Sequence, residues 1–133
     1  MTSSTWSCEA PRSLAGLGVD CESIKRFEAL LARDVYPLPS VFTADEVENA
    51  RASSRPAWSL CASYCAKEAV AKAICALFDL TMCELLFEGG VGEGELRLAE
   101  AFREEHGIAT ARAVVHGVPG EEGDLFVVAY LFS

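Results

Sequence analysis

Glu68 and Lys72 are the first residues whose types and spacing could do chemistry. They lie four positions apart, so on a helix they share one face, with the carboxylate one turn before the ammonium. On an exposed helix this spacing is typical of a surface ion pair. The segment that carries them, Ala57 to Phe78, is apolar or small at almost every position, which is typical of a central buried helix. Because buried charges are costly unless they are paired or bind a ligand, two interpretations stay open: a structural ion pair, or part of a charged site.

Asp20 is a second candidate, at the end of the apolar, glycine-containing segment Ser13 to Asp20, which predicts a short strand. A carboxylate at this place can cap the helix that follows, which is the more common role, or it can bind a metal ion. Together, Asp20 and Glu68 would suit Mg²⁺, which prefers oxygen ligands and usually shares them with phosphates.

The two histidines and the glycine-rich run lead to different interpretations. His116 lies at the end of a predicted strand before a loop, where a lone histidine is more often structural than catalytic. His106 precedes Gly107 at the end of a predicted helix, where a cation is favourable, so we interpret it as structural. The run Gly89–Gly94 matches neither a phosphate-binding loop nor a dinucleotide fingerprint, and we interpret it as a turn.

The cysteines and the N-terminus predict an intracellular chain. The six cysteines are Cys8, Cys21, Cys61, Cys65, Cys75 and Cys83. No Cys-x-x-Cys pair occurs, a zinc site would need more ligands than Cys61 and Cys65 offer, and we predict reduced cysteines in the core. Residues 1–10 lack the basic and apolar regions of a signal peptide, and no apolar run reaches the ~18 residues of a membrane span. We therefore expect a cytoplasmic protein.

Length and charge limit the possible classes further. A chain of 133 residues with 51% apolar content suits one globular domain, which we expect to span residues 13–133 behind an N-terminal extension of residues 1–12. The net charge of −9 argues against a general nucleic-acid binder. Residues 1–72 carry 8 basic and 9 acidic side chains, whereas residues 73–133 carry 3 and 11. A site for an acidic partner is therefore expected in the first half.

The elements that must position these residues follow from periodicity and from end signals. Glu22–Arg33 is amphipathic at helical spacing and predicts the first helix. Thr43-Ala-Asp-Glu46 has the form of a capping box, and a short helix to about Ala52 follows it. Pro56 suits the first turn of the long helix Ala57–Phe78.

The second half predicts mostly strands. The expected elements are a strand Met82–Glu88, an extended piece Glu95–Leu98, a helix Ala99–His106 and strands Ile108–Val115 and Leu125–Phe132. The whole order is therefore strand, three helices, two strands, helix, two strands. This order predicts an α+β fold in which one long central helix packs on a largely antiparallel sheet.

Several of these pieces also occur in an order that resembles a known family. The pieces are Gly18-Val-Asp20, Glu22-Ser-Ile-Lys-Arg26, Phe42-Thr-Ala-Asp-Glu46 and Ser63-Tyr-Cys-Ala-Lys-Glu-Ala-Val-Ala-Lys72. Their order and spacing resemble the holo-acyl-carrier-protein synthase type of 4′-phosphopantetheinyl transferase, over Leu14 to Ala76. The resemblance implies a 4′-phosphopantetheinyl transferase-like fold and transfer of the phosphopantetheine arm of coenzyme A to a carrier-protein serine, with release of 3′,5′-ADP.

The resemblance also implies roles for single residues. Asp20 and Glu68 would hold Mg²⁺, and Glu68 would also help to activate the serine hydroxyl. Lys72 would meet a phosphate of coenzyme A, and His116 would join the coenzyme A site. Arg26, with Lys25 nearby, would face an acidic acyl or peptidyl carrier protein, which could serve fatty-acid synthesis or another pathway. Small members of the family are typically homotrimers with sites between subunits.

Two departures from the family pattern keep a second function open. Where the family has Ser-x-Ser-His, this chain has Ala113-Val-Val-His116, so only the histidine remains. The acidic second half would also repel coenzyme A unless it faces away from the site. The alternative is a non-catalytic module on the same fold that binds a carrier protein or coenzyme A.

Overall fold

The computed structural model describes residues 13–33, 38–87, 92–117 and 123–133. The helices are α2 (Ile24–Ala32), α3 (Ala44–Ala52), α4 (Pro56–Ile74) and α5 (Glu100–His106), with a short 3₁₀ helix, η1 (Leu80–Met82). The strands are β1 (Leu14–Ser23), β2 (Cys83–Phe87), β3 (Glu93–Leu98), β4 (Thr110–Gly117) and β5 (Asp124–Phe132). Within this part of the chain the strands form one sheet in the order β1-β5-β4-β3-β2, with every neighbouring pair antiparallel.

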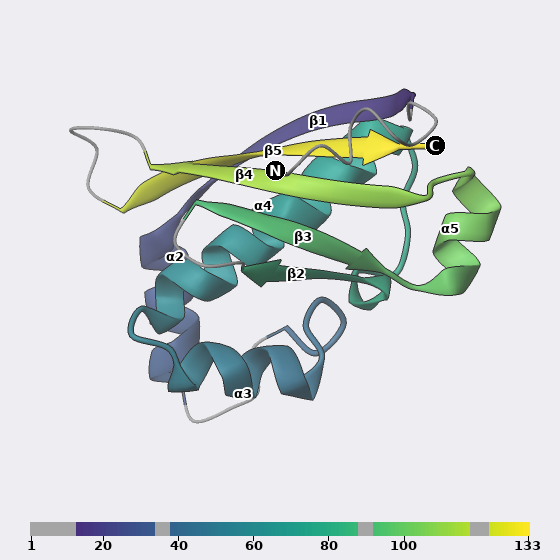
Figure 1. Cartoon of the computed structure of the whole chain (residues 1–133). Helices are drawn as coiled ribbons and strands as arrows, with labels where there is room; N and C mark the ends of the chain where they lie inside the picture. Colours follow the sequence, from purple (N-terminus) through teal and green to yellow (C-terminus); the bar gives the residue numbers. More distant parts are fainter. Residues whose placement is uncertain (1–12, 34–37, 88–91, 118–122) are drawn as a thin grey trace, which may run out of the picture.

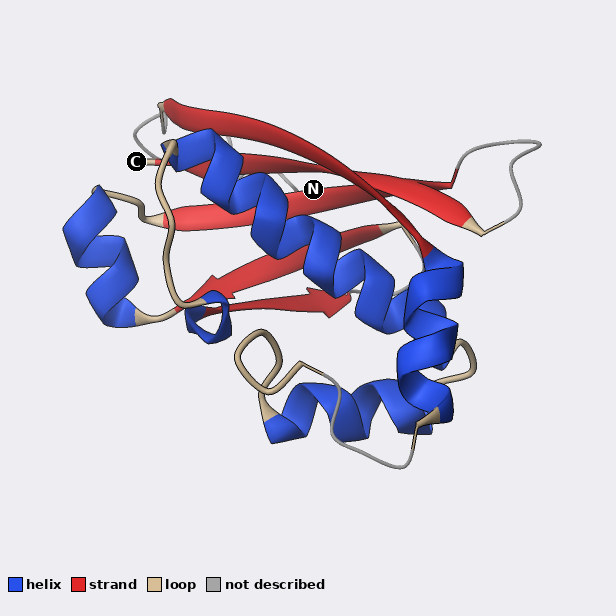
Figure 2. Cartoon of the chain, turned by 180° about the vertical axis from the view of Figure 1, so that it is seen from behind, coloured by secondary structure: helices blue, strands red, loops and turns tan. Residues whose placement is uncertain are grey.

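The elements form two layers (Figure 1). Helix α4 runs across one face of the sheet, and α2 and α3 pack beside it at one end (Figure 2). The predicted α+β fold, with a long central helix on an antiparallel sheet, is confirmed. No helix among the described residues is both long enough and apolar enough to cross a membrane.

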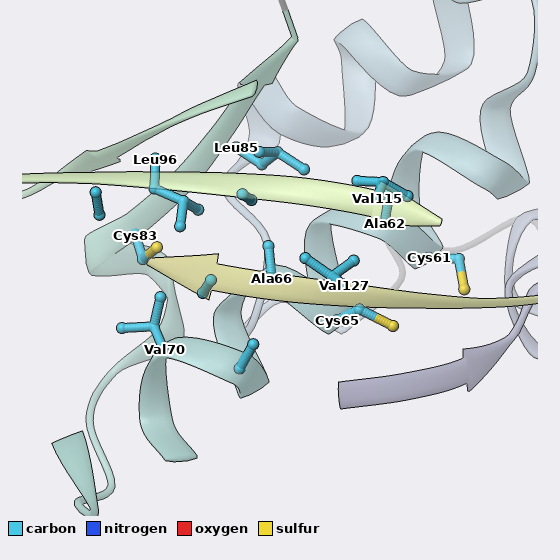
Figure 3. Close-up of a cluster of buried hydrophobic side chains, with 14 of the residues drawn as sticks. Cys61, Ala62, Cys65, Ala66, Val70, Cys83, Leu85, Leu96, Val115 and Val127 are labelled. Carbon is cyan, nitrogen blue, oxygen red and sulfur yellow. The ribbon is translucent and has the colours of Figure 1, made fainter. Parts of the chain in front are cut away.

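The core lies between α4 and the sheet (Figure 3). Helix α4 contributes small side chains, including Cys61, Ala62, Cys65 and Ala66, all fully buried. The facing strands contribute larger ones, such as Val127, and each such aliphatic side chain adds about 1.5–3 kcal/mol when it leaves water. Small residues on the helix therefore allow the sheet to approach it closely.

The closest approach is that of β1 to α4. A Cβ atom placed on Gly18 would lie 1.8 Å from the carbonyl oxygen of Ala69, so no larger residue fits there. On Gly16 it would lie 3.2 Å from the carbonyl oxygen of Ala73. The side chain at position 20, which points to the same face as Gly18, is therefore held against α4.

Several predicted boundaries are wrong, among them the following. The first helix begins at Ile24 rather than Glu22, because β1 continues past Asp20 and stays paired with β5 as far as Ser23. Helix α4 ends at Ile74 rather than Phe78, because Cys75 takes a left-handed conformation with φ of 54°. Strand β3 begins at Glu93, inside the predicted turn.

The predicted helix signals are confirmed at the other ends. The Thr43 hydroxyl accepts a hydrogen bond from the Glu46 N–H, and a Glu46 carboxylate oxygen accepts one from the Thr43 N–H, which completes the capping box. Pro56 is the first residue of α4. Gly107 ends α5 with φ of 65°. The described residues do not include the proposed extension, residues 1–12. They also do not include residues 88–91 and 118–122, which belong to two loops.

Candidate functional site

Asp20 and Lys72 meet where β1 crosses the C-terminal half of α4. The Lys72 Nζ atom donates to Asp20 Oδ1 at 2.8 Å and to the Val19 carbonyl oxygen at 3.1 Å. The hydrogen bond to Asp20 raises the pKa of Lys72 above its usual value, and the negative charges of Asp20 and Glu68 act in the same direction. Lys72 is therefore a stable cation at neutral pH, and its 57% exposed side chain is open to a ligand.

Asp20 keeps one oxygen unused. The residue is only 9% exposed, and its Oδ2 atom is buried without a hydrogen-bond partner among the described residues. A buried carboxylate oxygen in this condition costs free energy unless something binds it. The predicted role of Asp20 as a helix cap does not apply, because α2 begins four residues later and Ser23 is its N-cap residue.

Glu68 lies one helical turn before Lys72 and is half-buried. Its charge contributes to the raised pKa of Lys72 on one side and of Tyr64 on the other. The structure thus brings Asp20, which is distant in the sequence, to the turn of α4 that carries Glu68 and Lys72. We call these three residues the charged cluster.

The charged cluster fits a hard divalent cation. Among the described residues no group of three or more histidine, cysteine or carboxylate side chains could hold a metal ion by itself. Mg²⁺ does not need such a group, since it is commonly held by one or two carboxylates together with substrate phosphates and water. The unpaired Asp20 oxygen and the neighbouring Glu68 carboxylate supply donors of the required type.

Arg26 lies on α2, beside Tyr64 of α4, which is one helical turn before Glu68. Its Nη1 atom is 3.2 Å from a Glu22 carboxylate oxygen, and its guanidinium carbon is 5.1 Å from the ring centroid of Tyr64. Lys25 is exposed beside it. Both predicted carrier-binding residues are therefore at the surface, while Tyr64 was not predicted to take part. The sequence signal that could have identified Tyr64 is its spacing of four residues from Glu68 on the same helix.

His116 lies apart from the charged cluster. It is exposed near the end of β4 and stacks on Phe126 of β5, with ring centroids 4.8 Å apart. In the sheet register His116 pairs with Phe126, and Phe126 pairs with Cys21. This row points away from α4, whereas Asp20 points toward it. Within one chain the structure does not bring His116 to the other predicted site residues.

The other histidine has a structural setting. His106 is in the last turn of α5, where its ring packs 4.6 Å from that of Phe102 and its Nε2 atom lies 3.1 Å from a Glu105 oxygen. These contacts agree with the structural interpretation of His106.

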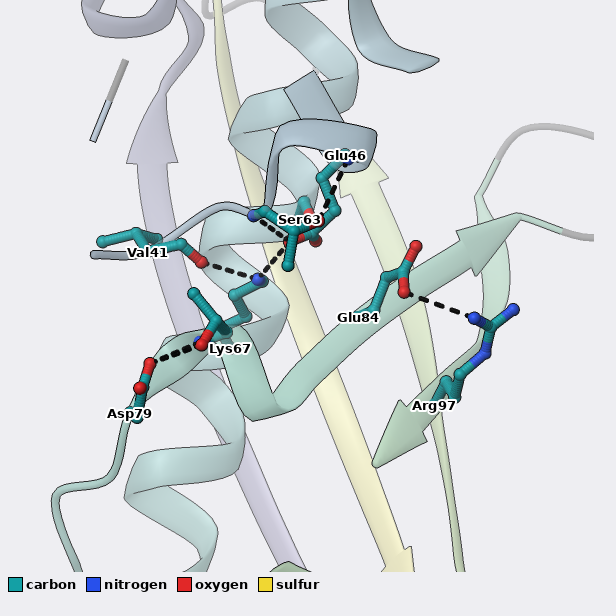
Figure 4. Close-up of polar contacts among 9 residues, drawn as sticks. Val41, Glu46, Ser63, Lys67, Asp79, Glu84 and Arg97 are labelled. Atoms are coloured by element: carbon teal, nitrogen blue, oxygen red, sulfur yellow. Dashed lines mark hydrogen bonds and ion pairs between the residues drawn. The ribbon is translucent and has the colours of Figure 1, made fainter. Parts of the chain in front are cut away.

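A buried ion pair on the opposite side of α4 was missed (Figure 4). Lys67 is fully buried, and its Nζ atom lies 2.8 Å from Glu46 Oε1 and 2.7 Å from the Val41 carbonyl oxygen. The Ser63 hydroxyl donates to the other oxygen of Glu46 at 3.2 Å. Sequence analysis identified Glu46 only as a capping residue. Its partner is 21 positions away, beyond the reach of any local pattern.

The described cysteines carry free thiols in two settings. Cys61, Cys65 and Cys83 are buried, whereas Cys21 and Cys75 are exposed. A hydrogen bond with Cys61, together with burial, raises the pKa of Cys65. Burial also raises the pKa of Cys83 to about 12. Cys65 and Cys83 therefore stay protonated. The three buried cysteines are small core residues, as predicted, but the two exposed ones do not belong to the core.

Comparisons with known proteins show the family of the chain. The family model described as the 4′-phosphopantetheinyl transferase superfamily (ACPS) matches residues 16–115. The chain is 33% identical over 128 residues to the holo-[acyl-carrier-protein] synthase of Moorella thermoacetica, covering 80% of this chain and 97% of that protein.

Solved structures share the fold. The holo-[acyl-carrier-protein] synthase of Neisseria meningitidis superposes with a TM-score of 0.72 at 21% identity, covering 90% of this chain and 98% of that one. The Helicobacter pylori enzyme in complex with coenzyme A gives a TM-score of 0.68 at 16% identity, covering 88% and 99%. These likenesses show the fold, and the family match together with the curated relative shows that the chain belongs to the 4′-phosphopantetheinyl transferase superfamily, as an enzyme of the holo-acyl-carrier-protein synthase family.

Proposed function

We propose that this enzyme transfers the 4′-phosphopantetheine arm of coenzyme A to a serine hydroxyl of an acyl or peptidyl carrier protein and releases 3′,5′-ADP. The observation that carries the proposal is the charged cluster, in which the exposed cation Lys72 pairs with Asp20, whose other oxygen is buried without a partner among the described residues, and feels the charge of Glu68. The coenzyme A complex of the Helicobacter pylori relative, which shares the fold, supports coenzyme A as the donor.

The reaction is a phosphoryl-type transfer whose atoms balance without a redox partner. The serine oxygen forms a bond to the phosphorus that carries the pantetheine arm. The bond between that phosphorus and the oxygen of the 3′,5′-ADP phosphate breaks, and its electron pair leaves with the 3′,5′-ADP. Glu68 takes the serine proton, directly or through water. The Lys72 ammonium turns from Asp20 to a phosphate and stabilises the charge of the leaving group.

Asp20 and Glu68 are the residues that would hold Mg²⁺. The metal would supply positive charge against the pyrophosphate of coenzyme A. The unpaired Oδ2 atom of Asp20 supports this assignment. It is a buried carboxylate oxygen that accepts no hydrogen bond from the described residues and can serve as a metal ligand.

The carrier protein is expected to dock on α2. Arg26 and Lys25 are exposed there, on the less acidic half of the chain, and Arg26 lies over Tyr64, one helical turn before Glu68. Cations at this place attract an acidic partner and speed its association. The strongly acidic segment after residue 72 contributes β2 to β5 and α5. Of these, β5 starts beside α2, where the Ile24 N–H donates to the Gly123 carbonyl oxygen.

We also propose a homotrimer, because the sheet has an apolar outer face. Leu17 and Val19 of β1 are 52% and 47% exposed, and β5 adds half-buried residues such as Phe126 and Tyr130 on the same face. Helices α2, α3 and α4 lie on the other face (Figure 1). Exposed apolar patches of this kind mark association surfaces. A second copy on this face would also give His116 a route to the coenzyme A site of its neighbour.

The test of the activity is intact-mass spectrometry of apo carrier proteins after incubation with this enzyme, coenzyme A and Mg²⁺. The expected result is a gain of one phosphopantetheine arm that disappears when the metal is chelated. Light scattering on the same sample checks the trimer. If the protein binds coenzyme A but modifies none of the carriers, the non-catalytic module replaces the transferase proposal. The cytoplasmic location remains a prediction from the sequence.

A further inference from the structure

Arg26 is restrained on several sides although it is at the surface. Its guanidinium carbon lies 5.1 Å from the ring centroid of Tyr64 and 5.6 Å from that of Phe27, while Nη1 pairs with Glu22 at 3.2 Å. The rings of Tyr64 and Phe27 are themselves 5.6 Å apart. An arginine placed over aromatic faces gains cation–π attraction and loses rotamer freedom before any partner arrives.

Tyr64 connects this restrained arginine to the charged cluster. It is on α4, one helical turn before Glu68, and its side chain is half-buried. Burial raises the pKa of Tyr64 and the charge of Glu68 raises it further, while the hydrogen bond and the charge of Arg26 act in the opposite direction. Since the pKa of Tyr64 is raised on balance, the phenol stays neutral. Going along α4 from the α2 end, the order is Arg26 over Tyr64, then Glu68, then Lys72 with Asp20.

We propose that Tyr64 is a positioning residue for the carrier protein: with Glu22 it fixes the guanidinium of Arg26 in the orientation that an acidic carrier meets, next to Glu68. This inference rests on the proposed function, because it assumes that a carrier protein docks on α2. Tyr64 acts through Arg26 and takes no part in the transfer step itself.

The size of the effect follows from preorganisation. Ordering one long side chain upon binding weakens affinity by about three- to tenfold, and a side chain that is already ordered avoids this loss. The structure holds Arg26 through the ring of Tyr64 as well as through Glu22. Removing the ring therefore weakens carrier binding by about three- to tenfold and leaves coenzyme A binding unchanged.

The experiment compares Tyr64→Leu, which removes the ring, with Tyr64→Phe, which keeps it. Both the KM of the apo carrier and its Kd, measured by fluorescence anisotropy of a labelled carrier, are expected to rise about three- to tenfold in Tyr64→Leu. In Tyr64→Phe they stay within about twofold of the wild type. Circular dichroism and thermal unfolding confirm that each variant is folded, and the KM of coenzyme A is measured in parallel.

A matched control uses the second arginine–aromatic contact of α4. Arg55 lies 5.1 Å from the ring centroid of Trp58, the same separation as Arg26 from Tyr64, but at the start of the helix. Trp58→Leu removes a comparable contact far from Glu68 in sequence, and carrier affinity is expected to stay unchanged. An equal loss in both variants would mean that general weakening of α4, and not the position of Arg26, lowers affinity.

A double-mutant cycle decides whether Tyr64 acts through Arg26. In the Arg26→Ala background, Tyr64→Leu is expected to change the carrier KM and Kd no further. If it still produces its full three- to tenfold effect there, or has none in the wild-type background, the inference is overturned. The proposed function fails by a different result, namely that the wild-type enzyme adds no phosphopantetheine to a carrier that it binds. In that case the Kd measurements still test whether Tyr64 positions Arg26 for the carrier.

Discussion

Two lysines of helix α4 are each 2.8 Å from a carboxylate oxygen, yet their surroundings are opposite. Lys67 and Glu46 are 0% and 6% exposed, and further hydrogen bonds from Thr43 and Ser63 satisfy the carboxylate. Lys72 is 57% exposed, and Asp20 keeps a buried oxygen with no partner among the described residues. Equal distances therefore do not imply equal roles.

The difference separates a structural side of α4 from the side on which we propose the chemistry. The pair of Lys67 and Glu46 joins α3 to α4 and leaves no polar group free for a ligand. The charged cluster on the β1 side has both an unpaired carboxylate oxygen of Asp20, which can bind a metal ion, and the accessible cation Lys72. Since α4 carries Lys67 and Glu68 next to each other, the first pair also fixes the helix that presents the second group.

The largest effect on stability is expected from Lys67→Met. Removing the ammonium leaves the Glu46 carboxylate buried without a cation, which lowers the free energy of unfolding by about 3–5 kcal/mol. Urea denaturation measures the change. The matched control is the double variant Lys67→Met with Glu46→Gln, which buries no charge, keeps a capping oxygen and recovers most of the loss. A loss below about 1 kcal/mol in the single variant would refute the structural role of the pair.

Lys72→Met is expected to show the reverse pattern. The free energy of unfolding changes by about 1 kcal/mol or less, because Lys72 is largely exposed. The transfer rate falls about 100-fold, the usual effect of losing one donor that stabilises developing charge. Parallel urea and rate measurements on Lys67→Met and Lys72→Met give the comparison directly. If Lys72→Met unfolds as readily as Lys67→Met, the division of roles is wrong.

The pH dependence of the Lys72 pair has a defined sign. The hydrogen bond to Asp20 raises the pKa of Lys72 above its unfolded value of about 10.4. The contribution of this pair to stability is therefore complete below that value and is lost as the pH rises through the folded pKa. Urea denaturation of wild type and Lys72→Met is expected to give a constant difference from pH 7 to pH 9. A difference that disappears within this range would contradict the raised pKa.

The smallest effect on stability is expected from replacing Cys75, which directly follows α4 at the end that carries Lys72. Cys75 has φ of 54° and ψ of 40°, a left-handed conformation that favours glycine. Cys75→Gly is therefore expected to raise the free energy of unfolding by about 0.5–1 kcal/mol, measured by thermal unfolding. Cys75→Ala is the control, since it removes the thiol but keeps the Cβ atom, and it brings no gain. Equal stabilisation by both variants would show that the backbone is unstrained.

Local signals in the sequence predicted much of the fold. The capping box at Thr43 and Glu46, Pro56 at the start of α4 and Gly107 at the end of α5 each depend on contacts within one helical turn. The boundaries that were wrong depend on distant contacts. Ser23 stays in β1 because Asp124 pairs with it, and the Ile24 N–H donates to the Gly123 carbonyl oxygen.

The sequence predicted which residue types form the candidate site more fully than it predicted their geometry. Spacing identified Glu68 and Lys72, and the place of Asp20 at the end of a predicted strand identified the third residue. The sequence could not show that Asp20 faces α4 while His116 faces the opposite side of the sheet, since that depends on the strand register. Nor could it pair Lys67 with Glu46, because only the packing of α3 on α4 brings these residues together.

The most direct test of the whole account is Glu68→Ala, with transfer and folding measured on the same preparation. Intact-mass spectrometry of an apo carrier with coenzyme A and Mg²⁺ is expected to show no added phosphopantetheine. Urea denaturation is expected to show a free energy of unfolding within about 1 kcal/mol of the wild type, because Glu68 is half-buried and, within the part of the chain that the structure describes, forms no buried ion pair such as that of Lys67 with Glu46. Transfer at the wild-type rate by folded Glu68→Ala would contradict the assignment of the chemistry to the β1 side of α4.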